Sequence, residues 1–165
     1  MDLYLIRHGL AGQHGDYVND AERPLTDEGK RKTRQVARQL HQLGLTFDLI
    51  LTSPLVRAKQ TAEILQTEGL GQLEEAEYLA PGGELQPWLD WLGTWRAANK
   101  VLALVGHEPN LSNWAELLVW GNAHGSLVLK KAGALAITMP DSGTPIGTSR
   151  LFWLTPPRFL VNDET

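Results

Sequence analysis

The sequence contains no cysteine. Disulfide bonds, thiolate catalysis and zinc sites built on cysteine are therefore excluded. The sequence also lacks an uncharged apolar stretch near the roughly 18 residues that a membrane-spanning helix needs. Residues 1–7 are too short a run, and too poor in basic side chains, for the core of a signal peptide. We therefore expect a cytoplasmic protein that does not contact a membrane.

The charge balance shows no excess of basic residues. Lys and Arg number 15 against 19 Asp and Glu, which gives a formal net charge of -4. Nucleic-acid binding is therefore not expected, because it needs a basic surface. The chain has 165 residues, of which 42% are hydrophobic, and it contains no repeat or linker. These values predict a single globular domain spanning residues 1–165, and we expect it to be a monomer.

Apolar runs and helical spacing alternate along the chain. Thr26 is a suitable N-cap for the first predicted helix, and Gly44 suits its C-terminal end. We predict strands at residues 3–6, 47–51, 101–105, 134–139 and 150–154, and helices at residues 27–43, 55–65, 87–98 and 110–120. The remaining segments are a loop at 10–25, an irregular stretch at 66–83 with a short strand near Tyr78, and a loop from Pro156 onward.

This alternation predicts an α/β fold with three layers, α/β/α. The last two strands follow each other without a helix between them, so we expect them to pair antiparallel. The sheet is then mixed and mostly parallel, with an antiparallel C-terminal strand.

Three of the predicted strands end in residues suited to chemistry. Arg7 and His8 end the first, Arg57 lies one helical turn after the second, and His107 follows the third. Ligands of open α/β sheets bind outside the carboxyl ends of the strands, and the N-termini of helices attract anions. If the three strands are neighbours, the two imidazoles and two guanidiniums converge at one edge of the sheet.

Such a set of cations suits a phosphoryl group. Arginine binds phosphate oxygens with a planar, permanently charged fork. No carboxylate cluster accompanies His8 and His107, so we predict neither a metal nor another cofactor. A neutral imidazole can attack phosphorus and form a covalent phosphohistidine, which the surrounding donors would stabilise.

Four segments resemble the histidine phosphatase superfamily, which includes the phosphoglycerate mutases. The segments are Arg-His-Gly within residues 5–9, Arg-Pro-Leu-Thr at 23–26, Ser-Pro-x-x-Arg-Ala within 53–62, and Gly-His-Glu-Pro at 106–109. They occur in the family's order and cover most of the chain. The resemblance implies a phosphoglycerate-mutase-like fold and assigns a role to each matching residue. The phosphoryl acceptor would be His8, the phosphate ligands would be Arg7, Arg57 and His107, and Gly9 and, more weakly, Arg23 would lie beside them.

The length of the chain and its 23–26 and 106–109 segments look like the SixA-type branch, which acts on phosphohistidine in proteins. Cleaving a P–N bond releases an imidazole whose conjugate acid has a pKa of about 6.5. Such a substrate needs little help from a general acid, unlike an alkyl phosphate. The expected partner is therefore a phosphorylated protein that carries phosphohistidine, and the expected function is signal transduction by dephosphorylation.

Two other functions stay open. Glu84 and Glu108 are candidate general acids, and with one of them the protein would be a phosphatase or mutase acting on a small phosphorylated metabolite. Both residues are equally suited to the start of a helix, where negative charge is favourable. A protein that only binds phosphorylated partners is the third possibility, and the intact nucleophile argues against it. Trp88, Trp91 and Trp95 share helical spacing, which indicates core packing more than docking.

Overall fold

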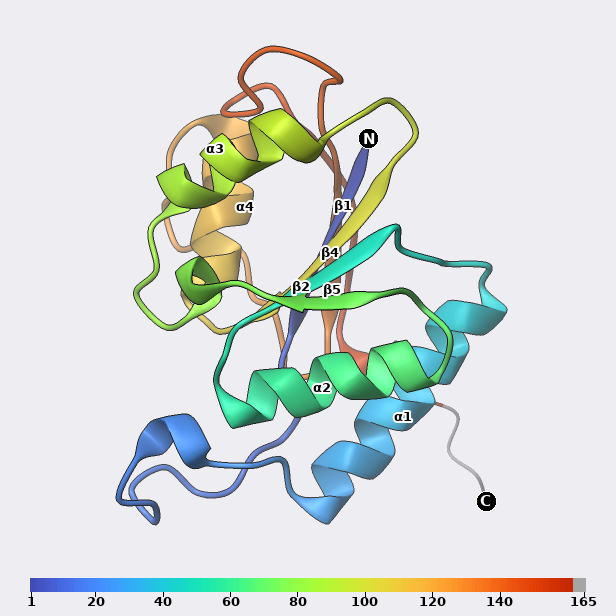
Figure 1. Cartoon of the computed structure of the whole chain (residues 1–165), viewed down its shortest axis with the longest axis vertical. Coiled ribbons are helices and arrows are strands. Elements are labelled where there is room, and N and C mark those ends of the chain that lie inside the picture. The colour runs from blue at the N-terminus through green and yellow to red at the C-terminus, as the bar shows by residue number, and fades with distance from the viewer. Residues whose placement is uncertain (162–165) are drawn as a thin grey trace.

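The computed structural model describes residues 1–161, which form one six-stranded sheet with helices on both of its faces (Figure 1). The strand order is β3-β2-β4-β1-β5-β6. The strands are β1 (Asp2–Arg7), β2 (Leu49–Thr52), β3 (Leu73–Glu75), β4 (Val101–Gly106), β5 (Ala134–Thr138) and β6 (Arg150–Thr155).

The sheet is mixed and mostly parallel, as predicted. Strand β4 pairs parallel to both β1 and β2, so the three strands that end in the candidate residues are neighbours. Strand β5 runs antiparallel to β1, and β6 runs antiparallel to β5. The antiparallel member is thus β5, and β6 points in the direction of β1.

Two helices cover each face of the sheet, which gives the predicted three layers (Figure 1). Alternate strand residues face opposite ways: Leu3 and Leu5 belong to one apolar cluster, and Tyr4 and Ile6 to the other. The first cluster includes α3 and α4, the second α1 and α2. The helices are α1 (Asp27–Gln42), α2 (Val56–Thr67), α3 (Leu85–Trp95) and α4 (Asn110–Trp120).

The ends of α1 follow the predicted capping. The Thr26 hydroxyl oxygen accepts a hydrogen bond from the Gly29 N–H at 2.9 Å. At the other end Gly44 takes a left-handed conformation with φ of 82°, which glycine adopts without steric cost.

The irregular segment differs from the prediction. Tyr78 lies in a short 3-10 helix, η2 (Glu77–Leu79), and the short strand is β3, upstream of it. Strand β3 is an edge strand whose residues are partly or fully exposed, so it shows no apolar alternation. The predicted strand near Tyr78 is therefore wrong.

Several element boundaries also differ. Strand β2 begins at Leu49 rather than Phe47, and α3 begins at Leu85 and ends at Trp95. A proline in the first turn of α3 is harmless because the first N–H groups of a helix have no partner inside it. The helix ends at Trp95 because the backbone of Arg96 is extended, and the Arg96 guanidinium donates from Nη1 to the Pro140 carbonyl at 3.4 Å. Two predicted loops contain the short 3-10 helices η1 (Asp20–Glu22) and η3 (Pro157–Phe159).

The three candidate tryptophans are not equivalent. Trp88 is fully buried and stacks on Trp114 with ring centroids 5.7 Å apart. Trp91 and Trp95 are half-buried and pack against the same cluster. Core packing, the favoured interpretation, therefore holds for this face of α3.

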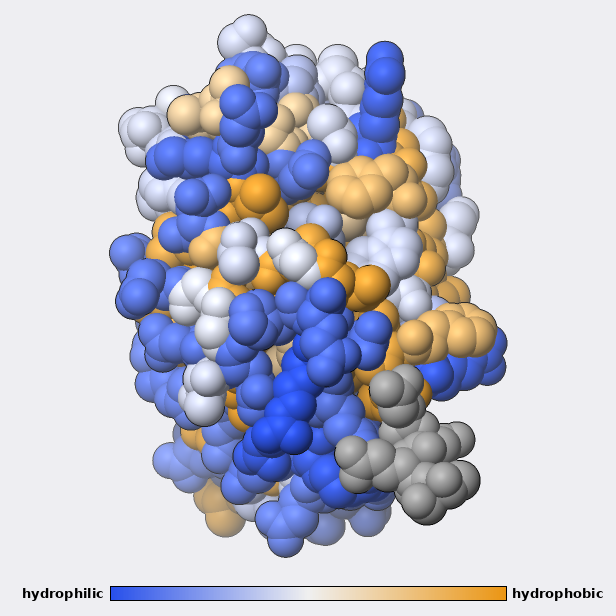
Figure 2. Space-filling view, turned by 90° about the vertical axis from the view of Figure 1, so that its right-hand side faces the viewer, coloured by the Kyte–Doolittle hydropathy of each residue, from blue (hydrophilic) through white to orange (hydrophobic). Residues whose placement is uncertain are grey.

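The surface agrees with the burial of apolar side chains between the layers. On the face shown in Figure 2, hydrophilic residues dominate the lower half and apolar residues form smaller patches. Within residues 1–161, no helix combines the length and apolar character needed to cross a membrane.

Candidate active site

The candidate residues meet where three neighbouring strands end. Strands β1 and β4 are in register up to Arg7 and Gly106, so His8 and His107 leave the sheet side by side. The His8 N–H donates to the Gly106 carbonyl at 3.0 Å, and the Ser53 N–H donates to the Val105 carbonyl at 3.0 Å. These bonds extend the sheet past its last formal pair and fix the direction in which each side chain leaves it.

His8 is held in one tautomer. Its Nδ1 lies 2.7 Å from the Gly9 carbonyl oxygen, which can only accept, so Nδ1 carries the proton. The lone pair of the neutral ring is therefore on Nε2. The pKa of His8 is lowered to about 3, mainly by burial and also by the positive charges of its neighbours, against the raising effect of the Gly9 bond. The ring is neutral at physiological pH and nucleophilic at Nε2.

His107 lies directly beside His8. The two ring centroids are 5.2 Å apart, with an angle of 54° between the planes. His107 Nε2 contacts the Ser53 hydroxyl at 2.7 Å, which fixes the ring. Burial and then Arg57 lower the pKa of His107 to about 4.

Two arginines complete the cluster. Arg7 donates from Nη1 to the Leu129 carbonyl at 3.1 Å. Arg57, in the first turn of α2, donates from Nη1 to the Asp20 carbonyl at 2.9 Å and pairs through Nη2 with the Asp20 carboxylate at 3.1 Å. Burial lowers the pKa of both guanidinium groups. A guanidinium group is not deprotonated in proteins at working pH. Both side chains are therefore cations held in a fixed place.

Unpaired donors concentrate in this cluster. Five buried side-chain N or O atoms have no hydrogen-bond partner among the described residues, and three of them are Arg7 Nε, Arg57 Nε and His107 Nδ1. Buried polar atoms normally find a partner, so three unpaired nitrogens in one cluster call for a functional reason. An anion rich in acceptor oxygens would satisfy them.

These side chains line a cavity of about 630 Å³, a size typical of small-ligand sites. Six of the residues predicted from the sequence line it: Arg7, His8, Arg23, Arg57, His107 and Glu108. His8 is only 5% exposed, but it faces this cavity and is not sealed in the core.

Gly9 and Glu84 do not line the cavity. The Gly9 N–H donates to the Thr61 hydroxyl at 3.0 Å, so the amide is committed to the fold. A Cβ at this position would lie 2.3 Å from Thr33 Oγ1, which explains the glycine by close packing against α1. Glu84 is the exposed N-cap residue of α3 and makes no capping hydrogen bond with its side chain.

Glu108 is at the cavity, but Ser112 holds its carboxylate. The Ser112 N–H donates to Oε1 at 3.1 Å, and the Ser112 hydroxyl donates to Oε2. Both oxygens therefore act as acceptors from the first turn of α4.

Sequence reasoning missed Asp20 and Lys131, which also line the cavity. Asp20 accepts a hydrogen bond from Arg23 Nε at 2.9 Å, and this bond is the main cause that lowers its pKa to about 2. Burial, followed by repulsion from Arg7, lowers the pKa of Lys131. The only sequence signal for Asp20 is its spacing of three residues from Arg23, and Lys131 has no sequence signal. Both residues lie in connecting segments, and the folding of the chain brings these segments to the site.

The loop that holds Arg7 is itself anchored by a buried carboxylate. Glu116 on α4 is fully buried, and its two oxygens accept hydrogen bonds from four successive backbone N–H groups, those of residues 124–127. The bond from the His124 N–H is the main cause that lowers the pKa of Glu116. The loop continues to Leu129, whose carbonyl accepts from Arg7, and to Lys131.

Among residues 1–161, no group of three or more His, Asp or Glu side chains could hold a metal ion. The arrangement combines a neutral imidazole, whose Nε2 can attack, with guanidinium groups that can neutralise an anion. Its chemistry is that of phosphoryl binding and transfer.

Comparison with known proteins agrees with this chemistry. Residues 3–80 match the family described as "Histidine phosphatase superfamily (branch 1)". An uncharacterised protein of Picosynechococcus sp. is 46% identical over 164 residues, which cover 98% of this chain and 99% of that protein.

Two solved structures share the fold. One is the protein histidine phosphatase SixA in complex with tungstate, with a TM-score of 0.84, 24% identity, and 97% of this chain and 99% of that chain covered. The other is a mutant phosphoserine phosphatase of Entamoeba histolytica in complex with phosphoserine, with a TM-score of 0.70, 19% identity, and 97% and 99% covered. The predicted phosphoglycerate-mutase-like fold is thereby confirmed.

Proposed function

Because this chain belongs to the histidine phosphatase superfamily, we propose that it removes the phosphoryl group from phosphohistidine in proteins. The observation that carries the proposal is the state of His8, a neutral imidazole with Nε2 available at a cavity lined by cations. The proposal places the protein in the SixA-type branch, as a metal-independent phosphatase.

The reaction takes two displacements. In the first, the Nε2 lone pair of His8 attacks phosphorus, and the imidazole of the substrate, which is protonated on its other ring nitrogen, leaves as a neutral ring with the electron pair of the P–N bond. In the second, water attacks the phosphoryl group on His8, which releases inorganic phosphate and returns the neutral ring. His8 thus ends the cycle as it began.

The cations stabilise the transferring group in both steps. Arg7 and Arg57 would bind its equatorial oxygens with their guanidinium groups, and the His107 ring would contact the same group, since all three side chains line the cavity. Arg23 lies at the cavity and pairs with Asp20, so it supports this field from the loop before α1. These roles match those implied by the family resemblance.

The substrate class follows from the leaving group. An imidazole leaves without strong acid assistance, because its conjugate acid has a pKa of about 6.5. The site offers little such assistance, since Glu84 lies outside the cavity and the Glu108 carboxylate accepts from Ser112. The protein whose structure gives a TM-score of 0.84 is described as a protein histidine phosphatase, which supports the same choice.

A second candidate is a phosphatase that acts on a small phosphorylated metabolite. Glu108 favours it, because this carboxyl group lies at the cavity where a proton donor for an alkoxide would be needed. The similar fold of a phosphoserine phosphatase points the same way.

The test is a side-by-side assay of a phosphohistidine protein, phosphoserine and phosphoglycerate. We expect kcat/KM for the phosphohistidine protein to be higher by about a hundredfold, the scale of the general-acid contribution that the other substrates would need. Glu108→Gln should slow phosphohistidine hydrolysis by less than about threefold. Glu84→Gln is the matched control outside the cavity. Efficient phosphoserine turnover that Glu108→Gln abolishes would establish the second candidate instead.

A further inference from the structure

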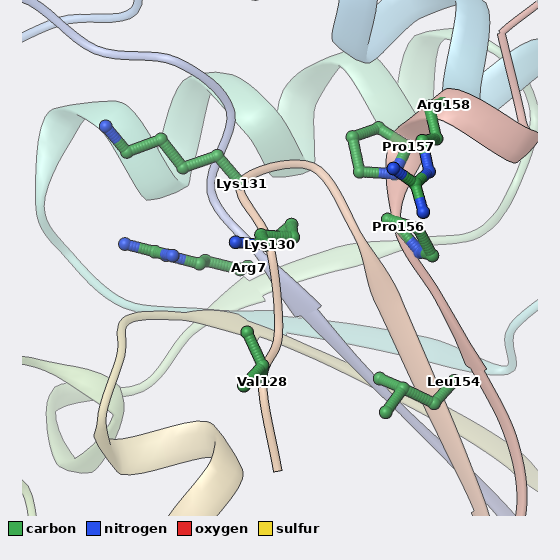
Figure 3. A pocket seen from close by; sticks show the side chains of 8 residues that line it. All are labelled: Arg7, Val128, Lys130, Lys131, Leu154, Pro156, Pro157 and Arg158. Atoms are coloured by element: carbon green, nitrogen blue, oxygen red, sulfur yellow. The ribbon is translucent and has the colours of Figure 1, made fainter.

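A second pocket of about 700 Å³, here called the side pocket, adjoins the candidate active site. Arg7 and Lys131 line both it and the cavity that holds His8. Figure 3 shows the side chains of Arg7 and Lys131 pointing away from Pro156, Pro157 and Arg158, which line the opposite side of the side pocket. A molecule bound in the side pocket would therefore lie next to the phosphoryl site.

The side pocket has apolar walls. Val128 is 61% exposed and Leu154 is 39% exposed, and Pro156 and Pro157 form the wall beside them. Apolar side chains that stay exposed together in a hollow are typical of interaction sites. The two prolines hold their part of the wall in a fixed backbone shape.

The rim of the side pocket is basic. Lys130 and Arg158 are exposed there, next to the shared Lys131. Within residues 1–161, none of the three has a carboxylate within 4.0 Å, whereas Arg23, Arg34, Arg38, Arg57 and Lys59 all do. A chain with a net charge of -4 thus gathers three exposed cations around one apolar hollow.

We propose that the side pocket binds the polypeptide segment next to the phosphohistidine of the substrate, and that this segment carries an apolar side chain flanked by carboxylates. The proposal rests on the proposed function and adds to it the chemistry by which a protein substrate is selected. The apolar side chain would pack against Val128 and Leu154, and the carboxylates would pair with Lys130 and Arg158. A small phosphorylated metabolite would fill the phosphoryl site without reaching this second pocket.

The test uses two phosphohistidine peptides and free phosphohistidine as substrates. One peptide carries Leu flanked by Asp and Glu beside the phosphohistidine, and the other has Lys in place of the acids. In the full chain, Lys130→Glu with Arg158→Glu should lower kcat/KM for the acidic peptide by about tenfold, mainly through KM, because exposed charge pairs act on association and weakly on chemistry. Hydrolysis of free phosphohistidine should change by less than about twofold, since neither residue lines the cavity.

The control is Arg31→Glu with Arg150→Glu, which changes the net charge equally at exposed positions outside the side pocket. The proposal is overturned if this control loses as much activity, if free phosphohistidine hydrolysis falls equally, or if the wild type does not prefer the acidic peptide. It is also overturned if the acidic peptide gains its advantage only after residues 162–165, which include Asp163 and Glu164, are removed. The occupant would then be the chain's own terminus.

The two proposals can fail separately. If the wild type hydrolyses phosphoserine peptides and no phosphohistidine, the proposed function fails, and the same two peptide sequences carrying phosphoserine then test the side pocket. If free phosphohistidine is hydrolysed well and both peptides equally, the proposed function stands and the side pocket has no part in selection.

Discussion

The two ring nitrogens of His8 have separate tasks. Nδ1 donates to the Gly9 carbonyl and fixes the ring, and Nε2 is available to the cavity. A histidine that must act as a nucleophile has to stay unprotonated, and burial among cations achieves this by lowering its pKa to about 3. The same positive charges would stabilise the anionic phosphoryl group, so one arrangement serves both the free and the phosphorylated ring.

The lowered pKa values also predict how stability depends on pH. His8 and His107 have pKa values of about 3 and about 4 in the folded chain, and both have a value of about 6.5 when unfolded. Between these values the unfolded chain binds more protons, so the free energy of unfolding falls as pH drops from about 6.5 to 4. Asp20 has a folded pKa of about 2, so its contribution to the free energy of unfolding is lost at lower pH, below this window.

Urea unfolding at successive pH values measures this effect. The variant His8→Asn with His107→Asn should lose less stability than the wild type across the same pH interval, because an amide side chain does not titrate. Parallel pH profiles for the two proteins would show that these rings do not have lowered pKa values in the folded state.

At the level of elements, two loops finish a site that the strand ends begin. The segment between β1 and α1 carries Asp20 and Arg23, and the segment between α4 and β5 carries Leu129 and Lys131. The second loop is held by the buried Glu116, whose oxygens accept four backbone N–H groups. Helix α4 therefore positions Arg7 indirectly, through a loop that it anchors.

Glu116→Gln tests this indirect role. The amide offers one acceptor oxygen instead of two and turns an N–H₂ group toward backbone donors, so the loop should loosen. We expect KM for a phosphorylated substrate to rise by about fivefold to tenfold with a smaller change in kcat, the effect of losing one charge-assisted hydrogen bond. Hydrogen exchange at residues 124–127 should speed up in the same variant. Faster exchange with an unchanged KM would show that the loop does not position Arg7.

At the scale of the whole molecule, positive charge is concentrated at the candidate active site. The chain is negative overall at -4, yet four cations, Arg7, Arg23, Arg57 and Lys131, line one cavity against two carboxylates, Asp20 and Glu108. Such a field attracts anionic substrates and is screened by salt within about 10 Å at 0.1 M. We therefore expect kcat/KM for a phosphorylated protein to fall severalfold between about 0.02 M and 0.5 M salt, with kcat nearly constant. Stopped-flow association rates provide the measurement, and salt-independent association would contradict this concentration of positive charge.

Much of the fold could be predicted because its signals are local. The buried strands that end at Arg7 and Gly106 are continuous apolar runs, and the N-cap at Thr26 is a short-range pattern. Strand β3 has no such signal, since it is a three-residue edge strand with the sequence Leu-Glu-Glu. Its place in the sheet comes from pairing with β2, which is a tertiary contact.

The candidate site likewise contains residues that the sequence could predict and residues that it could not. The convergence of His8, Arg57 and His107 could be predicted, because parallel strands bring their carboxyl ends to one edge. Asp20 and Lys131 could not, because their positions depend on how two loops fold back over that edge. A Cβ added at Gly106 would lie 3.3 Å from Leu111 Cδ2, so α4 packs closely against the same strand end.

The central claim is that the phosphoryl group passes through Nε2 of His8. Its most direct test is a rapid-quench, single-turnover reaction with a radiolabelled phosphohistidine protein, stopped in alkali and followed by peptide mapping. The account predicts a transient, alkali-stable and acid-labile label on His8, which the variants His8→Ala and His8→Gln do not form. Label on another residue, or phosphate release with no labelled chain at any time point, would contradict it.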